Sequence, residues 1–260
     1  MSRYAPLPRP LGALAVILAT AGGCRPAAGP TPPAAETEAS SGAAASTQPP
    51  RAGEPSSDDA LGWTPVAQED GITVTSRPSE QSPLPVFRGV GVVDAPLWEV
   101  LAVITDADRH YEWIFACSAS GLVAQTSDAT GIVYNRTATP WPVPDRDVVL
   151  DTQIEVIDAE RELAVRFSAT THPQRPPEDG VVRMTYLRGH YHLWAVDPEH
   201  TRVEYQVDSD PGGRLPTWLA TRGTRDMPLE SLRGLRAQLQ RTRGTYDERV
   251  ATLRRTLLPP

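Results

Sequence analysis

The sequence of 260 residues contains no lysine, only two cysteines and, before residue 61, a single aromatic residue, Tyr4. The absence of lysine excludes Schiff-base chemistry and phosphate binding by a P-loop lysine. Two cysteines cannot form a disulfide framework or a zinc site with four cysteine ligands. The formal net charge of −7 argues against a nucleic-acid partner, because proteins that bind nucleic acids normally carry an excess or a stripe of basic residues.

Residues 1–23 have the pattern of a secretory signal peptide. Arg3 and Arg9 precede a short apolar run, residues 11–21, and small residues follow it. A positively charged start, a short apolar stretch and small residues before the cleavage point are typical of these signals, and the stretch is too short to cross a membrane as a helix. We therefore expect this segment to be removed.

Cys24 follows two glycines, and this junction resembles the lipobox of bacterial lipoproteins, in which the cysteine is lipidated and becomes the mature N-terminus. Ala21 departs from the pattern, which usually has leucine there. The resemblance implies a lipid anchor at Cys24 in the bacterial cell envelope. Arg25 stands where an aspartate retains many lipoproteins in the inner membrane, which implies the periplasmic face of the outer membrane. An ordinary cleaved signal with an unmodified cysteine is the alternative.

Residues 24–60 form a segment of low complexity. From Arg25 to Ala60 there is no Val, Ile, Leu, Met or aromatic residue. Such a segment cannot bury enough apolar surface to offset the entropy lost on ordering, so we expect a disordered tether. Residues 61–260 contain no internal repeat and no second linker, and we expect them to form one domain.

This domain is expected to be rich in strands. Runs of alternating or continuous apolar residues, bounded by turns, predict strands at residues 72–75, 86–90, 121–126, 131–139, 147–157, 163–170, 181–196 and 201–209. Consecutive runs are joined by turns rather than helices, so the sheet is expected to be antiparallel. One helix is expected after Asp94-Ala95-Pro96, which supplies a cap residue and a proline in the first turn.

Helical periodicity replaces the strand pattern after Pro211-Gly212-Gly213. Leu232, Leu235 and Leu239 recur at helical spacing, and Pro228 is expected to kink or restart the helix. Residues 246–257 predict a last amphipathic turn or two. A long antiparallel sheet followed by a terminal helix indicates an α+β fold, in which the helix packs across the concave face of the sheet.

Six short motifs follow one another along this domain. They are Asp70-Gly71-Ile72-Thr73-Val74, Phe87-Arg88-Gly89, Glu112-Trp113, the proline-rich loop at residues 140–147, Gly180-Val181-Val182-Arg183, and residues 210–219. The ordered set resembles the START (StAR-related lipid transfer) family. The resemblance implies a helix-grip fold, in which a curved antiparallel sheet wraps a long C-terminal helix around an internal apolar cavity. Family members bind a single lipid or sterol there and have no catalytic centre, so we expect neither an enzyme nor a cofactor.

A lipid cavity needs an apolar lining and a few polar groups that orient the ligand. The expected ligand-binding residues are Arg183, Asn135, Thr152, Trp113, Trp194, Trp218 and Leu219. An outward-facing Arg183 is the alternative for that residue, and ordinary core packing is the alternative for the tryptophans. Asn135, with Tyr134 as the alternative, and Thr152 stand near the positions where sterol-binding members of the family place an acid and an arginine. The resemblance therefore implies a neutral polar end and leaves the ligand class open.

Arg146 and Asp147 lie in the proline-bounded loop. Arg146 is flanked by two aspartates, and arginine geometry favours carboxylate partners. We expect these residues to hold the loop through salt bridges rather than to contact a ligand.

The charges of the domain are unevenly distributed. Residues 61–213 hold 11 arginines and 23 acidic residues, whereas residues 214–260 hold ten arginines and four acidic residues. The basic terminal helix could therefore dock on anionic lipid headgroups. The arginines expected to do so are Arg233, Arg236, Arg241 and Arg243. The alternative is a helix face with ionic partners on the acidic sheet.

Few residues suggest catalysis or metal binding. His190 and His192 are two apart, so on a strand they face the same side and could hold a metal, but no third ligand is suggested nearby. Cys117 could act as a nucleophile with His110, although a buried reduced cysteine is more frequent. We expect a protein that binds, and carries or senses, one lipid or other hydrophobic molecule. A hydrolase or cyclase acting in the same cavity is the alternative, and a structural envelope lipoprotein with an empty cavity is a third.

Overall fold

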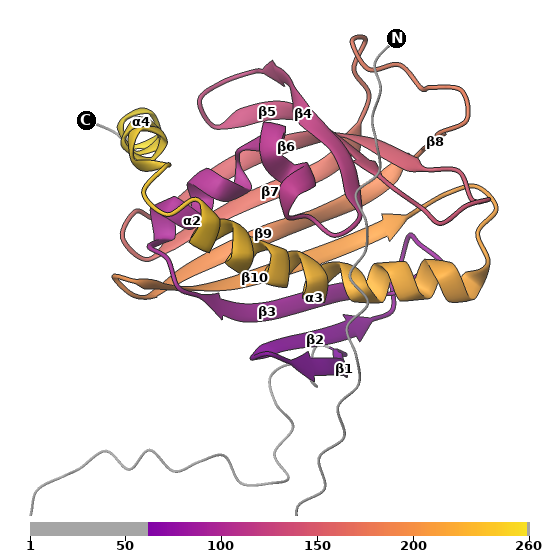
Figure 1. Ribbon diagram of the computed structural model, residues 1–260, viewed down its shortest axis with the longest axis horizontal. Coiled ribbons are helices and arrows are strands. Elements are labelled where there is room, and N and C mark those ends of the chain that lie inside the picture. The colour runs from indigo at the N-terminus through magenta and orange to yellow at the C-terminus, as the bar shows by residue number, and fades with distance from the viewer. Residues whose placement is uncertain (1–61, 259–260) are drawn as a thin grey trace, which may run out of the picture. The chain divides into compact units, whose positions relative to one another are not determined.

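A large antiparallel sheet dominates the computed structural model, which describes residues 62–258 (Figure 1). Its strands are β1 (Thr64–Glu69), β2 (Ile72–Arg77), β3 (Val86–Val93), β4 (Cys117–Gln125), β5 (Thr130–Thr137), β6 (Arg146–Asp158), β7 (Glu162–Thr170), β8 (Val182–Arg183), β9 (Tyr186–Asp197) and β10 (His200–Asp210). Their spatial order is β1-β2-β3-β10-β9-β7-β6-β5-β4, and β8 pairs in parallel with β6. Since β1 and β4 are the two ends of this order, the described strands form an open curved sheet.

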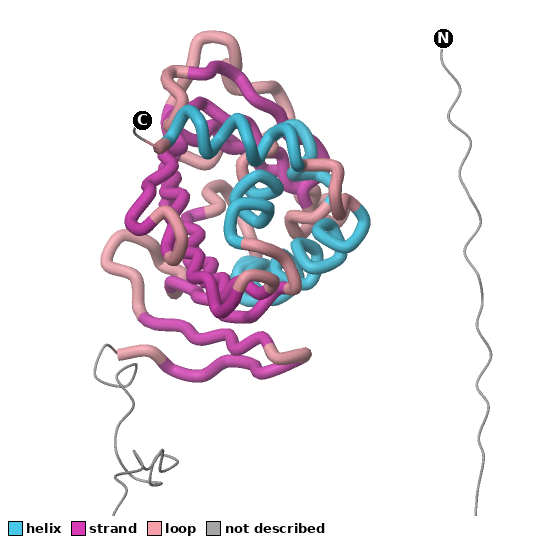
Figure 2. The backbone as a smooth tube through the Cα atoms, turned by 90° about the vertical axis from the view of Figure 1, so that its left-hand side faces the viewer, coloured by secondary structure: helices cyan, strands magenta, loops and turns pink. Residues whose placement is uncertain are grey.

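The helices lie within the curve of this sheet (Figure 2). They are α2 (Leu97–Ile104), the 3-10 helix η1 (Ala107–Glu112), α3 (Thr217–Arg241) and α4 (Asp247–Leu257). The expected α+β class and the helix-grip arrangement are confirmed, because α3 crosses the sheet beside β3 and β10. No helix in the described part of the chain is both long and apolar enough to span a membrane.

The long helix α3 buries the apolar stripe that its sequence predicts. Leu232, Leu235 and Leu239 are at most 3% exposed and belong to the main core cluster. The expected restart at Pro228 is wrong, because α3 continues through it. Pro228 instead packs on β3, where a Cβ added to Gly89 would lie 2.8 Å from the proline Cβ. The bare glycine therefore lets the helix approach the sheet closely.

The strand expected at residues 181–196 is present but interrupted, because it divides into β8 and β9. The Met184 N–H donates to the carbonyl oxygen of Asp147 at 2.8 Å, which ties this segment to β6 before the chain turns into β9.

Strand β1 and the helix η1 were not expected. The predicted signal peptide, the lipidation site at Cys24 and the tether at residues 24–60 lie outside the described residues.

Candidate ligand cavity

The concave side of the sheet encloses a cavity of about 310 Å³, here called the sheet cavity. Apolar side chains from five strands supply much of its wall: Leu122, Val133, Val148, Leu150, Ile154, Val165, Phe167, Leu187 and Tyr191. The helix α4 contributes Thr252 and Leu253 to the same wall. Because neighbouring residues of a strand face opposite sides, this lining follows directly from the alternation of apolar residues along β5, β6 and β7.

Asn135 on β5 and Thr152 on β6 both line the sheet cavity, as the sequence predicts. The Thr152 hydroxyl donates to the carbonyl oxygen of Gly131 at 2.8 Å. Asn135 lies beside His110, whose Nδ1 is 3.3 Å from the amide oxygen of Asn135. Neither position carries a charge, although Asp128 and Arg249 contribute charged groups elsewhere to the lining.

His110 also lines the sheet cavity, although its place in the sequence suggested it only as a partner for Cys117. Its Nε2 donates to the carbonyl oxygen of Ile104 at 2.8 Å. Burial lowers the pKa of this imidazole below its ordinary value, so the ring is neutral at pH 7. The irregular segment around η1 has no periodicity that would have indicated which way this side chain points.

Aromatic side chains from β7, β9 and β10 form one side of the sheet cavity. The rings of Tyr191 and Tyr205 stack with centroids 4.4 Å apart, and Phe167 lies 5.9 Å from Tyr191. Trp113 packs behind Tyr191 at 6.1 Å and lines neither cavity described here. The alternative for Trp113, ordinary core packing, is therefore what the structure shows.

Trp194 also lines neither cavity. It follows Tyr191 by three residues on β9, so the alternation of the strand places it on the opposite face. There it stacks on His192 at 3.9 Å, and the Arg202 guanidinium lies over its ring at 4.3 Å. This position gives no support to the expected contact of Trp194 with a ligand in the cavity, and the same parity could have indicated the outer face from the sequence.

The histidines on this outer face have carboxylate partners. His190 Nε2 is 3.1 Å from Glu204, and His192 Nε2 is 2.6 Å from Glu162. The described residues contain no group of three or more side chains arranged to hold a metal ion. Each of the two histidines therefore has a carboxylate partner of its own on the outer face.

Cys117 lines the sheet cavity at the start of β4. Burial raises the pKa of its thiol to about 11. The reactive form of cysteine is the thiolate, so this environment disfavours the nucleophilic role considered for Cys117.

A second cavity of about 490 Å³, here called the helix cavity, lies beside the first turns of α3. Trp218 and Leu219 line it, as the sequence predicts for a ligand site, together with Leu215, Pro140 and Arg146. The two cavities adjoin, because they share lining residues. The shared residues are Phe115, Thr137, Met184 and Met227.

Arg183 serves the proline-bounded loop rather than a ligand. Its guanidinium makes two hydrogen bonds of 2.8 Å to the carboxylate of Asp147, and it lines neither cavity. The position of Arg183 gives no support to its expected ligand contact, whereas Asp147 forms a salt bridge as expected for this loop. Arg146 also holds the loop, but through the carbonyl oxygens of Pro144 and Gly212 instead of the expected carboxylates.

The arginines proposed for membrane docking are engaged with the body of the domain. Arg233 pairs with Glu69, Asp70 and Glu230 at 2.6–2.8 Å. Arg236 donates to the carbonyl oxygens of Asp70 and Val92. Arg241 and Arg243 donate to the carbonyl oxygens of Glu112 and Asp94. The alternative, a helix face with partners on the body, fits these contacts.

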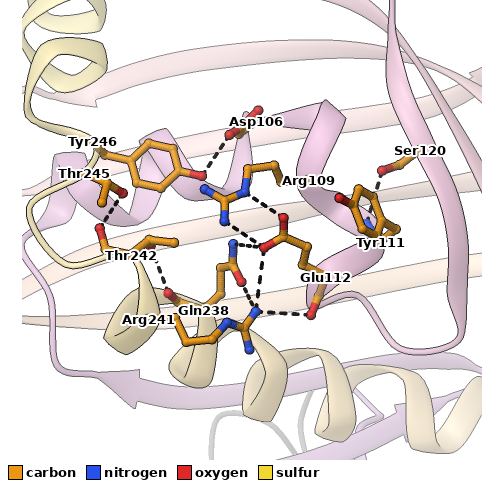
Figure 3. Close-up of polar contacts among 10 residues, drawn as sticks. All are labelled: Asp106, Arg109, Tyr111, Glu112, Ser120, Gln238, Arg241, Thr242, Thr245 and Tyr246. Atoms are coloured by element: carbon orange, nitrogen blue, oxygen red, sulfur yellow. Dashed lines mark hydrogen bonds and ion pairs between the residues drawn. The ribbon is translucent and has the colours of Figure 1, made fainter. Parts of the chain in front are cut away.

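Figure 3 shows how η1 is joined to α3 and to the start of α4. Glu112 accepts hydrogen bonds from Arg109 at 2.8 Å and from Gln238 at 2.9 Å, and these donors lower its pKa to about 2. The Tyr246 hydroxyl donates to Asp106 at 2.8 Å. Because His110 belongs to η1, this network fixes one polar group of the sheet cavity relative to the helices.

Comparisons with known proteins agree with this architecture. The START domain model matches residues 57–245. An uncharacterized protein of Pseudomonas aeruginosa is 32% identical over 69% of this chain and 87% of its own length. A solved STAR-related lipid transfer protein fragment from Xanthomonas axonopodis is 32% identical, covers 69% of this chain and 99% of that chain, and has a TM-score of 0.62. The mouse phosphatidylcholine transfer protein is 25% identical over 60% of this chain and 74% of its own length. The chain belongs to the START domain family.

Proposed function

We propose that this protein binds one lipid or other hydrophobic molecule and carries or senses it at the bacterial cell envelope. The observation that carries the proposal is the pair of adjoining, largely apolar cavities of about 310 and 490 Å³. Each lies within the range of roughly 300–1,000 Å³ that is typical of small-molecule pockets. The neutral polar groups of His110, Asn135 and Thr152 would orient a hydroxyl or carbonyl group of the ligand.

The domain would contact the membrane at the helix cavity rather than along the whole of α3. Trp141 is 93% exposed next to Pro140, and Trp218 is 68% exposed on the cavity wall. Tryptophan is favoured at the interface between lipid and water. Arg222 and Arg225 lie on the same part of α3 and supply positive charge for anionic headgroups.

The N-terminal segment would keep the domain close to this membrane. With Cys24 lipidated on the periplasmic face of the outer membrane, the tether to residue 60 would behave as a coil of about 36 residues with a span of roughly 33 Å. That reach allows the domain to touch the anchoring bilayer without being embedded in it.

A hydrolase or cyclase in the same cavity remains the second candidate, because His110 and Cys117 both line the sheet cavity. Their environments give it little support. Burial raises the pKa of Cys117 to about 11 and keeps His110 neutral and bonded to a backbone carbonyl.

Native mass spectrometry of the full chain carrying Cys24→Ser, incubated with lipid vesicles and repurified, tests the proposal. We expect one bound lipid per chain. Thr152→Trp should abolish this adduct by filling the sheet cavity, whereas Gln153→Trp on the exposed face of β6 should not. A chemically altered product would instead support catalysis. A protein that stays empty with every lipid offered would contradict lipid binding.

A further inference from the structure

Arg146 is a buried cation at the start of β6. The residue is 3% exposed and lines the helix cavity. Its two terminal nitrogens donate to backbone carbonyl oxygens, of Pro144 and of Gly212, the latter at 3.3 Å. Its Nε is buried and has no hydrogen-bond partner. None of these contacts neutralises the charge of the guanidinium.

The carboxylates on either side of Arg146 are taken by other arginines. Asp145 accepts from Arg136 at 2.9 Å, and Asp147 accepts from Arg183 at 2.8 Å. Among the residues that the structure describes, no carboxylate forms an ion pair with Arg146. Buried charges in proteins are normally paired, because removing an ion from water without a counter-charge is costly.

The remainder of the helix cavity does not supply the missing negative charge. Asp226 is the one acidic residue among its lining residues, and it pairs with Arg222 at 3.6 Å and with Arg225 at 3.0 Å. The first turn of α3 contains no acidic residue, and its Trp218 and Leu219 line the cavity. The positive end of the helix dipole therefore adds to the charge of Arg146.

We propose that the helix cavity binds the anionic group of the hydrophobic ligand, a carboxylate or a phosphate, with Arg146 as its counter-charge. The planar guanidinium suits both groups. The apolar chain of the ligand would pass Phe115, Met184 and Met227, which line both cavities, into the sheet cavity. This proposal rests on the proposed function and names its ligand class: an acidic amphiphile with one hydrophobic chain or more.

The test compares ligands that share a chain and differ in charge. The Cys24→Ser chain is titrated with dodecanoate, dodecyl phosphate, methyl dodecanoate and inorganic phosphate, below the concentrations at which the amphiphiles aggregate. We expect the two anionic amphiphiles to bind at least about tenfold more tightly than the ester, which corresponds to one charge-assisted hydrogen-bonded contact. Inorganic phosphate alone should bind far more weakly than dodecyl phosphate, since it lacks the chain.

Substitutions of single arginines show whether the preference for anionic amphiphiles depends on Arg146. Arg146→Gln should bind the ester as wild type does and lose the preference for the acids, whereas Arg146→Lys should retain part of it. Arg166→Gln removes an exposed arginine of β7 that lines neither cavity and should leave the preference unchanged. If Arg146→Gln fails to fold, the wild-type comparison of acid with ester still decides the matter.

The two proposals fail in different ways. Equal binding of dodecanoate and its methyl ester by the wild-type chain would overturn the anionic site and leave lipid binding intact. A preference for acids that survives Arg146→Gln, or a site that binds inorganic phosphate as tightly as dodecyl phosphate, would overturn it too. Binding of none of the amphiphiles would count against the proposed function itself.

Discussion

At the scale of single residues, the proline-bounded loop depends on one buried ion pair. Asp147 is 1% exposed, and its carboxylate is paired with the guanidinium of Arg183. Arg183→Ala would leave that carboxylate buried without a counter-charge, so we expect a loss of about 3–5 kcal/mol in the free energy of unfolding. Urea denaturation measures this loss. Arg166→Ala breaks an exposed pair with Glu155 and should lower stability by less than about 1 kcal/mol. Equal losses in the two variants would refute the role of the buried pair.

His110 should make stability depend on pH. Burial lowers its pKa in the folded state below the ordinary value of 6.5, so the unfolded chain binds the proton more readily. The stability that the neutral ring contributes is complete above pH 6.5 and falls as the pH drops below that value. Urea midpoints measured between pH 5 and 8 should therefore decline less steeply in His110→Gln than in wild type. His200, whose exposed ring has a raised pKa, is present in both proteins and cancels from the difference. Parallel curves would contradict the prediction.

Cavity residues can be predicted from the sequence where they belong to a strand, because alternate side chains of a strand share one face. Asn135 and Thr152 were predicted from the resemblance to the START family, and the alternation along β5 and β6 agrees with their place on the cavity wall. Tyr191 could have been found in the same way, and Trp194 excluded. His110 could not be placed, because the irregular segment around η1 has no periodicity and because Asn135, one of its partners, lies on a separate strand. Arg146 was expected to hold its loop by pairing with carboxylates. The neighbouring carboxylates instead pair with Arg136 and Arg183, and the fold alone decides where these two arginines lie.

At the scale of elements, the position of α3 is set by glycines on the surfaces that meet. A Cβ added at Gly234 would lie 2.1 Å from the carbonyl oxygen of Trp113, whereas one added at Gly223 in the same helix meets nothing within 4 Å. Gly234→Ala should therefore destabilise the fold by about 1–3 kcal/mol through overpacking, despite the better helix propensity of alanine. Gly223→Ala should stabilise it by about 0.5–1 kcal/mol. Thermal and urea unfolding measure the change in stability of both variants. Equal changes in the two variants would show that α3 does not pack closely against Trp113.

Element types could be predicted better than element pairing. The alternation of apolar residues indicates the long strands, and the leucine spacing indicates α3. The interruption between β8 and β9 could not be foreseen, because the apolar pattern runs through it and a backbone bond from Met184 to Asp147 imposes the break. Pro228 misled the helix prediction for a similar reason: its effect depends on Gly89, a residue on a distant strand.

At the scale of the whole molecule, arginines of the basic C-terminal part of the domain bind groups on its acidic body. Arg233, Arg236 and Arg241 all reach partners on the sheet or on η1. Neutralising these three with Arg243 should therefore lower the unfolding free energy. Our proposal instead puts the membrane contact at the rim of the helix cavity, where Trp141 is 93% exposed.

Vesicle cosedimentation of the Cys24→Ser chain shows which of two surfaces contacts the membrane, the rim of the helix cavity or the arginine-bearing face of α3. Trp141→Ser removes an exposed aromatic side chain that lines neither cavity, so it should reduce vesicle binding several-fold while stability and ligand affinity stay near wild type. Trp194→Ser, on the outer face of β9, is the matched control and should leave vesicle binding unchanged. If neutralising the four arginines reduces binding to anionic vesicles in a protein that is still folded, while Trp141→Ser does not, the membrane is met along α3. Ligand exchange with the membrane would then begin at the arginine-bearing face of α3 rather than at the part of the helix cavity that Trp218 lines.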